Sequence, residues 1–142
     1  MSYASWFESH ATKHKKIVDK LVLKGYTKEQ IIDYFEFENM VKEENDFCPL
    51  YKTNTKCHDM ENLNCYLCAC PHFRFDDNGL DTYNNTKILS VCNIKNGEKT
   101  SGGGNIHQSC SKCSVPHHKA YIDKTFDLDW KKIMKDCMPN EI

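Results

Sequence analysis

Long hydrophobic runs are missing from this chain of 142 residues. No segment approaches the roughly twenty apolar residues that a membrane-spanning helix needs. The first residues, MSYASWFESHATKHKK, also lack the apolar stretch of a signal peptide. The sequence therefore predicts a cytoplasmic protein with no contact to a membrane.

The chain also has very little arginine and almost no net charge. Arg74 is the single arginine, and 19 basic residues stand against 20 acidic ones, so the net charge is −1. Bidentate recognition of phosphate or guanine uses arginine side chains, so we do not expect specific nucleic-acid binding. The partner, a protein or a small molecule, stays unknown.

Motifs of several metal-dependent or haem enzymes are absent as well. The chain has no HExxH, no HxE followed by CxxC in the order of the zinc deaminases, and no CxxCH for haem attachment. These absences favour a non-enzymatic metal-binding module over an enzyme. No catalytic residue is assigned.

Cysteine, in contrast, is abundant. The chain has nine cysteines, and the apolar fraction of 39% includes them, so the core is thin for this length. In a reducing cytoplasm, clustered cysteines are more often metal ligands or redox groups than disulfides, and an odd total fits poorly with a fully paired framework. Eight of the nine fall within residues 47–118: Cys48, Cys57, Cys65, Cys68, Cys70, Cys92, Cys110 and Cys113.

The spacing of these cysteines predicts two metal sites. Two CxxC motifs, at residues 65–68 and 110–113, together make a tetrahedral thiolate site of the zinc-ribbon or knuckle kind. Cys70 adds a third sulfur beside the first motif, so eight thiolates suggest two zinc ions close together. The favoured grouping, with other pairings left open, assigns Cys65, Cys68, Cys110 and Cys113 to one site and Cys48, Cys57, Cys70 and Cys92 to the other.

Iron is the alternative to zinc. Cysteine precedes proline in CPLY and again in CPHF, and a Cys-Pro pair also closes the cysteine run of bacterial ferredoxins, although their regular CxxCxxC is absent here. An iron–sulfur cluster with a redox or enzymatic role is therefore the second hypothesis. Four histidines near the cysteines are candidates for supporting or replacing a ligand: His58, His72, His107 and His117.

The order of these motifs resembles a known family. FCPLY, the Cys57-His58 pair, NCYLCACPHF and the CSKC turn followed by VPHH are similar to the cysteine-rich small domain family, which is zinc-finger-like. The resemblance covers residues 47–118 and implies metal-ligand roles for the eight cysteines, with Cys92 the least secure. It implies no settled activity. Some relatives are attached to cobalamin-biosynthesis proteins or occur near them. This chain departs from the short form of the family by its N-terminal hairpin and C-terminal helix, so a link to cobalamin metabolism stays open.

The flanking segments predict helices. In residues 1–46 the capping patterns Ser5/Glu8 and Thr27/Gln30 precede apolar residues at helical spacing, and Gly25 separates them, which predicts a helical hairpin. Residues 119–142 predict a C-terminal helical segment in which Asp127 or Asp129 caps the last turn. The isolated Cys137 falls on the apolar stripe of that segment and is expected to be a buried side chain, as is typical of free cysteine.

The cysteine-rich middle predicts loops and short strands. Residues 73–75 and 88–91 are the expected strands, and Asn78-Gly79 and Asn96-Gly97 are the expected hairpin turns. The SGGGN run at 101–105 is expected to be a mobile loop. The whole chain is therefore predicted to form one small, irregular α+β domain, whose metal-stapled core, residues 47–118, lies between the hairpin and the C-terminal helix.

Overall fold

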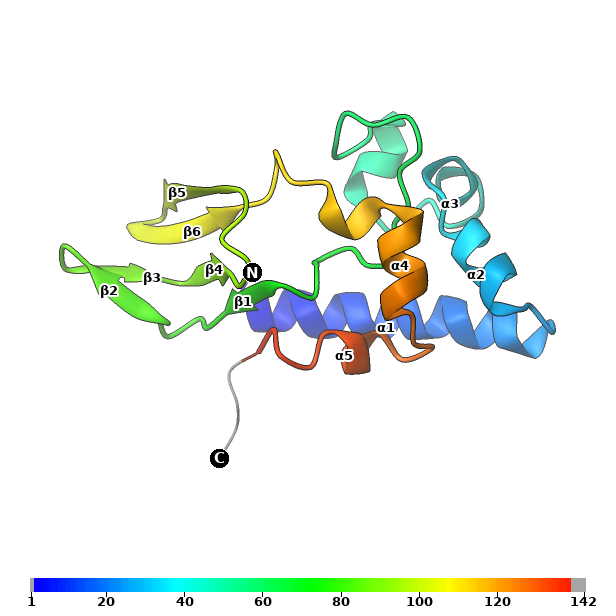
Figure 1. The fold of residues 1–142 in the computed structure, drawn as a ribbon, viewed down its shortest axis with the longest axis horizontal. Coiled ribbons are helices and arrows are strands. Elements are labelled where there is room, and N and C mark those ends of the chain that lie inside the picture. The colour runs from blue at the N-terminus through cyan, green and yellow to red at the C-terminus, as the bar shows by residue number, and fades with distance from the viewer. Residues whose placement is uncertain (1, 139–142) are drawn as a thin grey trace.

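A computed structural model, which describes residues 2–138, shows a small α+β fold (Figure 1). The α-helices are α1 (Tyr3–Leu23), α2 (Lys28–Tyr34), α3 (Phe37–Glu43), α4 (Lys119–Thr125) and α5 (Trp130–Ile133), with two 3₁₀ helices, η1 (Pro49–Thr53) and η2 (Val115–His117). The strands are β1 (Phe73–Phe75), β2 (Asp81–Tyr83), β3 (Thr86–Ile88), β4 (Ser90–Cys92), β5 (Glu98–Gly102) and β6 (Asn105–Ser109). The α+β class predicted from the sequence is confirmed.

Helix α1 is the longest element, and it runs beside both the strands and the short helices (Figure 1). It begins after Ser2, whose hydroxyl accepts a hydrogen bond from the Ser5 N–H, so the predicted Ser5/Glu8 cap is wrong by one turn. Gly25, at φ 80°, follows its end as predicted. One face of α1 is buried along the helix, and its buried residues are Phe7, His10, Ala11, His14, Ile17, Val18 and Leu21.

The predicted second helix is broken in two. The capping box of Thr27 and Gln30 at the start of α2 is confirmed, since both of its hydrogen bonds form. After α2, the Phe35 carbonyl accepts from the Cys65 N–H and the Phe37 N–H donates to the Leu63 carbonyl, each at 2.8 Å. These backbone groups bond to residues 63–65 instead of continuing the helix. The cysteine-rich segment is thereby joined to the N-terminal helices.

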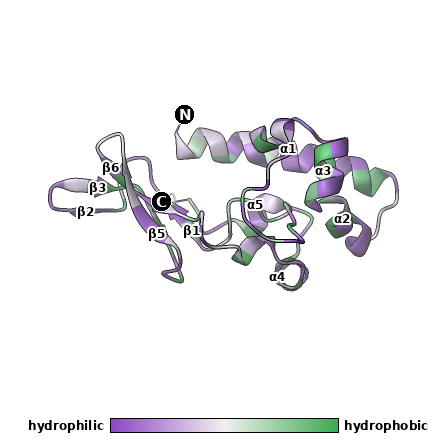
Figure 2. Ribbon diagram, turned by 90° about the horizontal axis from the view of Figure 1, so that it is seen from above, coloured by the Kyte–Doolittle hydropathy of each residue, from purple (hydrophilic) through white to green (hydrophobic). Residues whose placement is uncertain are grey.

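The strands form two small sheets. Strands β1 and β4 pair antiparallel, and the second sheet has the order β2-β3-β6-β5 with β3 and β6 parallel. The strand predicted at 88–91 is divided at Leu89, whose N–H donates to the Ile106 carbonyl while the chain passes from one sheet to the other. The strand predicted at 73–75 is confirmed as β1. Figure 2 shows β2 and β5 at the end of the molecule, where their residues are exposed.

The hairpin turns lie at different dipeptides from those predicted. Asn84-Asn85 connects β2 to β3 and Gly103-Gly104 connects β5 to β6, with φ between 50° and 79° at all four residues. Left-handed φ at both central residues is what a two-residue hairpin turn of type I′ requires. The strands on either side of Asn78-Gly79 and of Asn96-Gly97 do not pair with each other, so these two predictions are wrong. The predicted mobile loop at 101–105 is instead part of the β5–β6 hairpin.

The C-terminal helices close the core against α1. The Asp129 carboxylate caps α5 by accepting from the Lys131 N–H, as predicted for one of the two aspartates. Trp130 then packs against Phe7 at a ring-centroid distance of 4.8 Å. Cys137 is buried, as predicted for an isolated cysteine on an apolar stripe. No helix among residues 2–138 is long and apolar enough to cross a membrane.

Candidate metal centre

Three potential ligands meet where the segment after η1 approaches η2. The Cys57 sulfur lies 3.0 Å from His58 Nδ1 and 3.7 Å from His117 Nε2. The ligand atoms of these three residues all lie within 4.8 Å of one another, and no other group in the described chain is this compact. Cys57 is exposed and His117 is buried. The group can hold a metal ion.

The hydrogen bonds fix the tautomer of both histidines. His117 Nδ1 lies 2.8 Å from the Asn64 carbonyl oxygen, and His58 Nε2 lies 2.8 Å from the Cys110 carbonyl oxygen. A carbonyl oxygen only accepts, so each of these nitrogens carries the proton and the other nitrogen of each ring keeps a lone pair. Both lone pairs face the Cys57 sulfur. The single proton of the Cys57 thiol can be donated to only one of these lone pairs. A bound cation, in contrast, is coordinated by both lone pairs and by the Cys57 thiolate.

Burial keeps His117 in the form that binds metals. Burial lowers the pKa of His117, although its hydrogen bond to the Asn64 carbonyl acts in the opposite direction. Zinc–sulfur and zinc–nitrogen bonds at a tetrahedral angle give a sulfur–nitrogen separation of roughly 3.6 Å. The Cys57–His117 distance of 3.7 Å is close to this value, and the Cys57–His58 distance of 3.0 Å needs a small opening.

Three further cysteines lie outside the compact group and are linked to Cys57 through their effects on thiol pKa values. Burial raises the pKa of Cys65 to about 12, although the neighbouring Tyr51 hydroxyl acts in the opposite direction and the Cys57 and Cys48 thiolates add to the rise. Burial also raises the pKa of Cys68, as do the thiolates of Cys65, Cys57 and Cys48. The Tyr51 hydroxyl is buried and makes no hydrogen bond to nitrogen or oxygen within the described residues, and it lies beside the Cys65 thiol. We call Cys48, Cys57, Cys65 and Cys68 the first thiol group.

We call the remaining four clustered cysteines, Cys70, Cys92, Cys110 and Cys113, the second thiol group. Burial raises the pKa of Cys70 to about 11, and the thiolates of Cys110, Cys113 and Cys92 raise it further. Burial likewise raises the pKa of Cys110, followed by the thiolates of Cys113 and Cys92. Asn96 donates its backbone N–H to the Cys92 sulfur at 3.4 Å and its side-chain amide to the Cys113 sulfur at 3.1 Å.

The pKa effects favour a grouping of the thiols that differs from the favoured sequence hypothesis, and that hypothesis stays a prediction. That hypothesis places the two CxxC motifs in one site. The thiolates that raise the pKa of Cys68, however, belong to residues 48–65, whereas those that raise the pKa of Cys70 belong to residues 92–113. Spacing along the chain did not contain this information. The grouping depends on the path of the backbone between Cys68 and Cys70.

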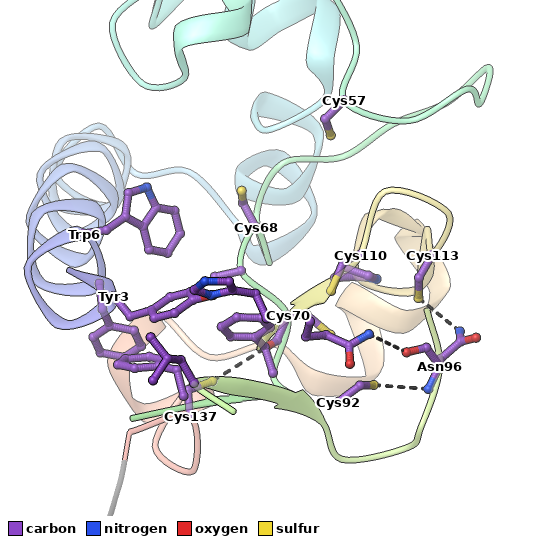
Figure 3. A pocket seen from close by; sticks show the side chains of 18 of the residues that line it. Tyr3, Trp6, Cys57, Cys68, Cys70, Cys92, Asn96, Cys110, Cys113 and Cys137 are labelled. Atoms are coloured by element: carbon purple, nitrogen blue, oxygen red, sulfur yellow. Dashed lines mark hydrogen bonds between the residues drawn. The ribbon is translucent and has the colours of Figure 1, made fainter. Parts of the chain in front are cut away.

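One cavity adjoins both thiol groups. Its volume is about 790 Å³, and seven of the nine cysteines lie in its wall: Cys57, Cys68, Cys70, Cys92, Cys110, Cys113 and Cys137. Figure 3 shows Tyr3 and Trp6 of α1 on the side of this cavity opposite Asn96. All nine cysteines are free thiols, as metal ligation requires.

The other two candidate histidines are engaged elsewhere. His72 Nε2 bonds to the Tyr121 hydroxyl at 2.9 Å. His107 uses both nitrogens, with Nδ1 2.7 Å from the Tyr3 hydroxyl and Nε2 3.0 Å from the Gly102 carbonyl. Neither belongs to the compact ligand group, whereas His58 and His117 do.

Three residues of the centre were not identified from the sequence. Tyr51 lies beside the first thiol group, Asn64 orients His117, and Asn96 contacts two sulfurs of the second group. No motif spacing distinguishes them from other tyrosines and asparagines. Tyr51 alone had an indication, since it follows Cys-Pro in CPLY at an interval that is repeated in CPHF.

Comparison of the chain with protein-family models, with curated proteins and with solved structures gave no significant match. The resemblance to the cysteine-rich small domain family therefore stays a prediction from the motif order.

Proposed function

We propose that the protein is a zinc-binding module in which metal ions hold the cysteine-rich middle together. The first ion is held by Cys57, His117 and His58, and a thiolate of the first thiol group completes the tetrahedron. The observation that supports this most directly is the convergence of two imidazole lone pairs on the Cys57 sulfur. Such a mixed set of sulfur and nitrogen ligands is typical of zinc.

The surrounding structure supports a stapling role. Cys57 and His117 are 60 residues apart along the chain, and an ion bound to both joins the Cys57 segment directly to η2. Each histidine also donates to a backbone carbonyl, an arrangement that is common around metal-ligating histidines and fixes their rings. A ligand set closed by four protein atoms provides cohesion, not chemistry. The partner of the module is an unidentified protein or small molecule.

Elemental analysis of protein purified without added metal tests this proposal. We expect about two zinc equivalents in the wild type, and we expect Cys57→Ser and His117→Gln each to lose one. His107→Gln is the matched control, because His107 lines the same cavity outside the ligand group. A metal-free but folded wild type, or full metal content in His117→Gln, contradicts the proposal.

An iron–sulfur protein is the second candidate. Its support is the cavity of about 790 Å³ with seven cysteines in its wall, which offers sulfur ligands in a largely apolar setting. Anaerobic purification followed by an absorption spectrum separates the two candidates. A colourless protein that contains zinc excludes the cluster, and brown protein with sulfur-to-iron charge-transfer bands replaces zinc and supports a redox role.

A further inference from the structure

The segment CAC at residues 68–70 places two cysteines one residue apart, yet their thiols belong to different groups. The backbone explains how. Ala69 has φ 92° and Cys70 has φ 62°, so two consecutive residues other than glycine lie in the left-handed region. Such conformations cost roughly 1–2 kcal/mol per residue and persist where the surrounding structure requires them. The reversal turns Cys70 away from Cys68 and toward β4.

A chain of contacts then connects Cys70 to three other cysteines. The Phe73 N–H donates to the Cys70 carbonyl at 3.1 Å, and Phe73 is the register partner of Cys92 in the β1–β4 pair. Asn96 connects Cys92 to Cys113, and the Cys113 N–H donates to the Cys110 carbonyl at 3.0 Å. All four cysteines lie in the wall of the same cavity, near Asn96 (Figure 3).

We infer that Cys70, Cys92, Cys110 and Cys113 form a second zinc site, separate from the ion at Cys57. The inference rests on the proposed function, and it assigns the second ion to the last four clustered cysteines. Four thiolates are a complete tetrahedral ligand set for structural zinc.

Asn96 is the second observation that indicates a metal–thiolate site. It directs two N–H groups at two different sulfurs, one from the backbone and one from its side chain. Hydrogen bonds of this kind stabilise thiolate charge and orient the ligands of an ion. A pair of neutral thiols in a simple apolar core has no need of two donors. Asn96 is therefore assigned as a positioning residue of the second site.

Double variants distinguish this assignment from the alternative in which the two CxxC motifs share an ion. Native mass spectrometry counts the bound zinc ions directly. We expect two ions in the wild type, one in the Cys92→Ser/Cys113→Ser double variant and none in the Cys57→Ser/Cys92→Ser double variant. If the two CxxC motifs share an ion, the second double variant keeps one ion and the first keeps none, and either result overturns the assignment.

Loss of metal is expected to unfold some cysteine variants, so Asn96→Ala provides an independent test. We expect a chelator to remove one of its two zinc ions at a roughly tenfold lower concentration than in the wild type, because the supporting donor to Cys113 is lost. Asn93→Ala is the matched control, since Asn93 is exposed in the same loop. Unchanged removal of both ions from Asn96→Ala overturns the assignment. A wild type that contains no metal refutes the proposed function instead.

Discussion

Two buried histidines of α1 predict a loss of stability in mild acid that is independent of the metal ligands. His14 is completely buried beside Phe35 and Tyr66, and its Nε2 donates to the Tyr66 carbonyl at 3.1 Å. Burial lowers the pKa of His14 to about 3, and nearby His10 lowers it too. Burial lowers the pKa of His10 to about 4, with a smaller effect of Lys13.

The sign and size of the effect follow from these values. The unfolded chain takes up a proton on each imidazole near pH 6.5, whereas the folded chain takes it up only near pH 3 to 4. Stability from these groups is therefore complete well above pH 6.5 and decreases as the pH falls toward the folded values. At pH 5.5 each histidine has lowered the free energy of unfolding by about 1.4 kcal/mol, and the two together by about 3 kcal/mol.

His14→Gln isolates one of these contributions. The glutamine amide is neutral at every pH and is long enough to donate to the Tyr66 carbonyl in place of Nε2. Between pH 7.5 and pH 5.5 in urea unfolding, we expect the wild type to lose about 1.4 kcal/mol more than His14→Gln. His118→Gln, at an exposed histidine, is expected to match the wild type. Equal losses in His14→Gln and in the wild type refute the argument, because proton uptake by the metal ligands affects both proteins alike.

Two further predictions concern packing around the metal centre. We expect Cys137→Ser to keep the full metal content and to change the free energy of unfolding by less than about 1 kcal/mol, because the serine hydroxyl still donates to the Cys70 carbonyl. Elemental analysis and urea unfolding measure these two quantities. Loss of an ion contradicts the prediction. We expect Gly97→Ala to destabilise the protein by more than 2 kcal/mol in the same assay, because its new Cβ would lie 2.5 Å from the Ser109 carbonyl oxygen at φ +75°. Gly103→Ala is the control, because a Cβ at Gly103 would have no atom within 4 Å, although φ is +59° there. We expect this variant to lower the free energy of unfolding only by the roughly 1 kcal/mol that the left-handed conformation costs. Equal losses of stability in the two variants contradict the predicted clash.

The elements that the sequence predicted well are those fixed by local patterns. The apolar stripe of α1, the stop at Gly25 and the Thr27/Gln30 capping box depend on residues within a few positions of one another. The break after α2 was not predictable in this way. It depends on hydrogen bonds from Phe35 and Phe37 to a segment nearly thirty residues further along the chain. Tertiary pairing there outweighs helix propensity.

The metal centre shows the same division between local and distant information. The cysteine spacing predicted thiolate clustering, and Cys57 with His58 and His117 confirms a candidate group that can hold a metal. The sequence did not indicate the left-handed turn at Ala69 and Cys70, on which the proposed grouping of the thiols depends. Glycine usually indicates such a turn in a sequence, because it has no Cβ and adopts left-handed φ readily. Neither of the two residues at this turn is a glycine.

The two CxxC motifs differ in what their intervening residues do, and this difference connects the first thiol group to the core. Tyr66 and Leu67, between Cys65 and Cys68, are completely buried, and the Trp130 indole donates to the Cys68 carbonyl at 3.3 Å. Ser111 and Lys112, in the second motif, are exposed. Residues 54–72 contain no helix or strand, so the order of this segment depends on these buried side chains and on whatever binds its sulfurs. An ion in the first group that binds Cys65 or Cys68 therefore fixes the same turn that inserts Tyr66 and Leu67 into the core, whereas an ion in the second group fixes a surface turn beside β6.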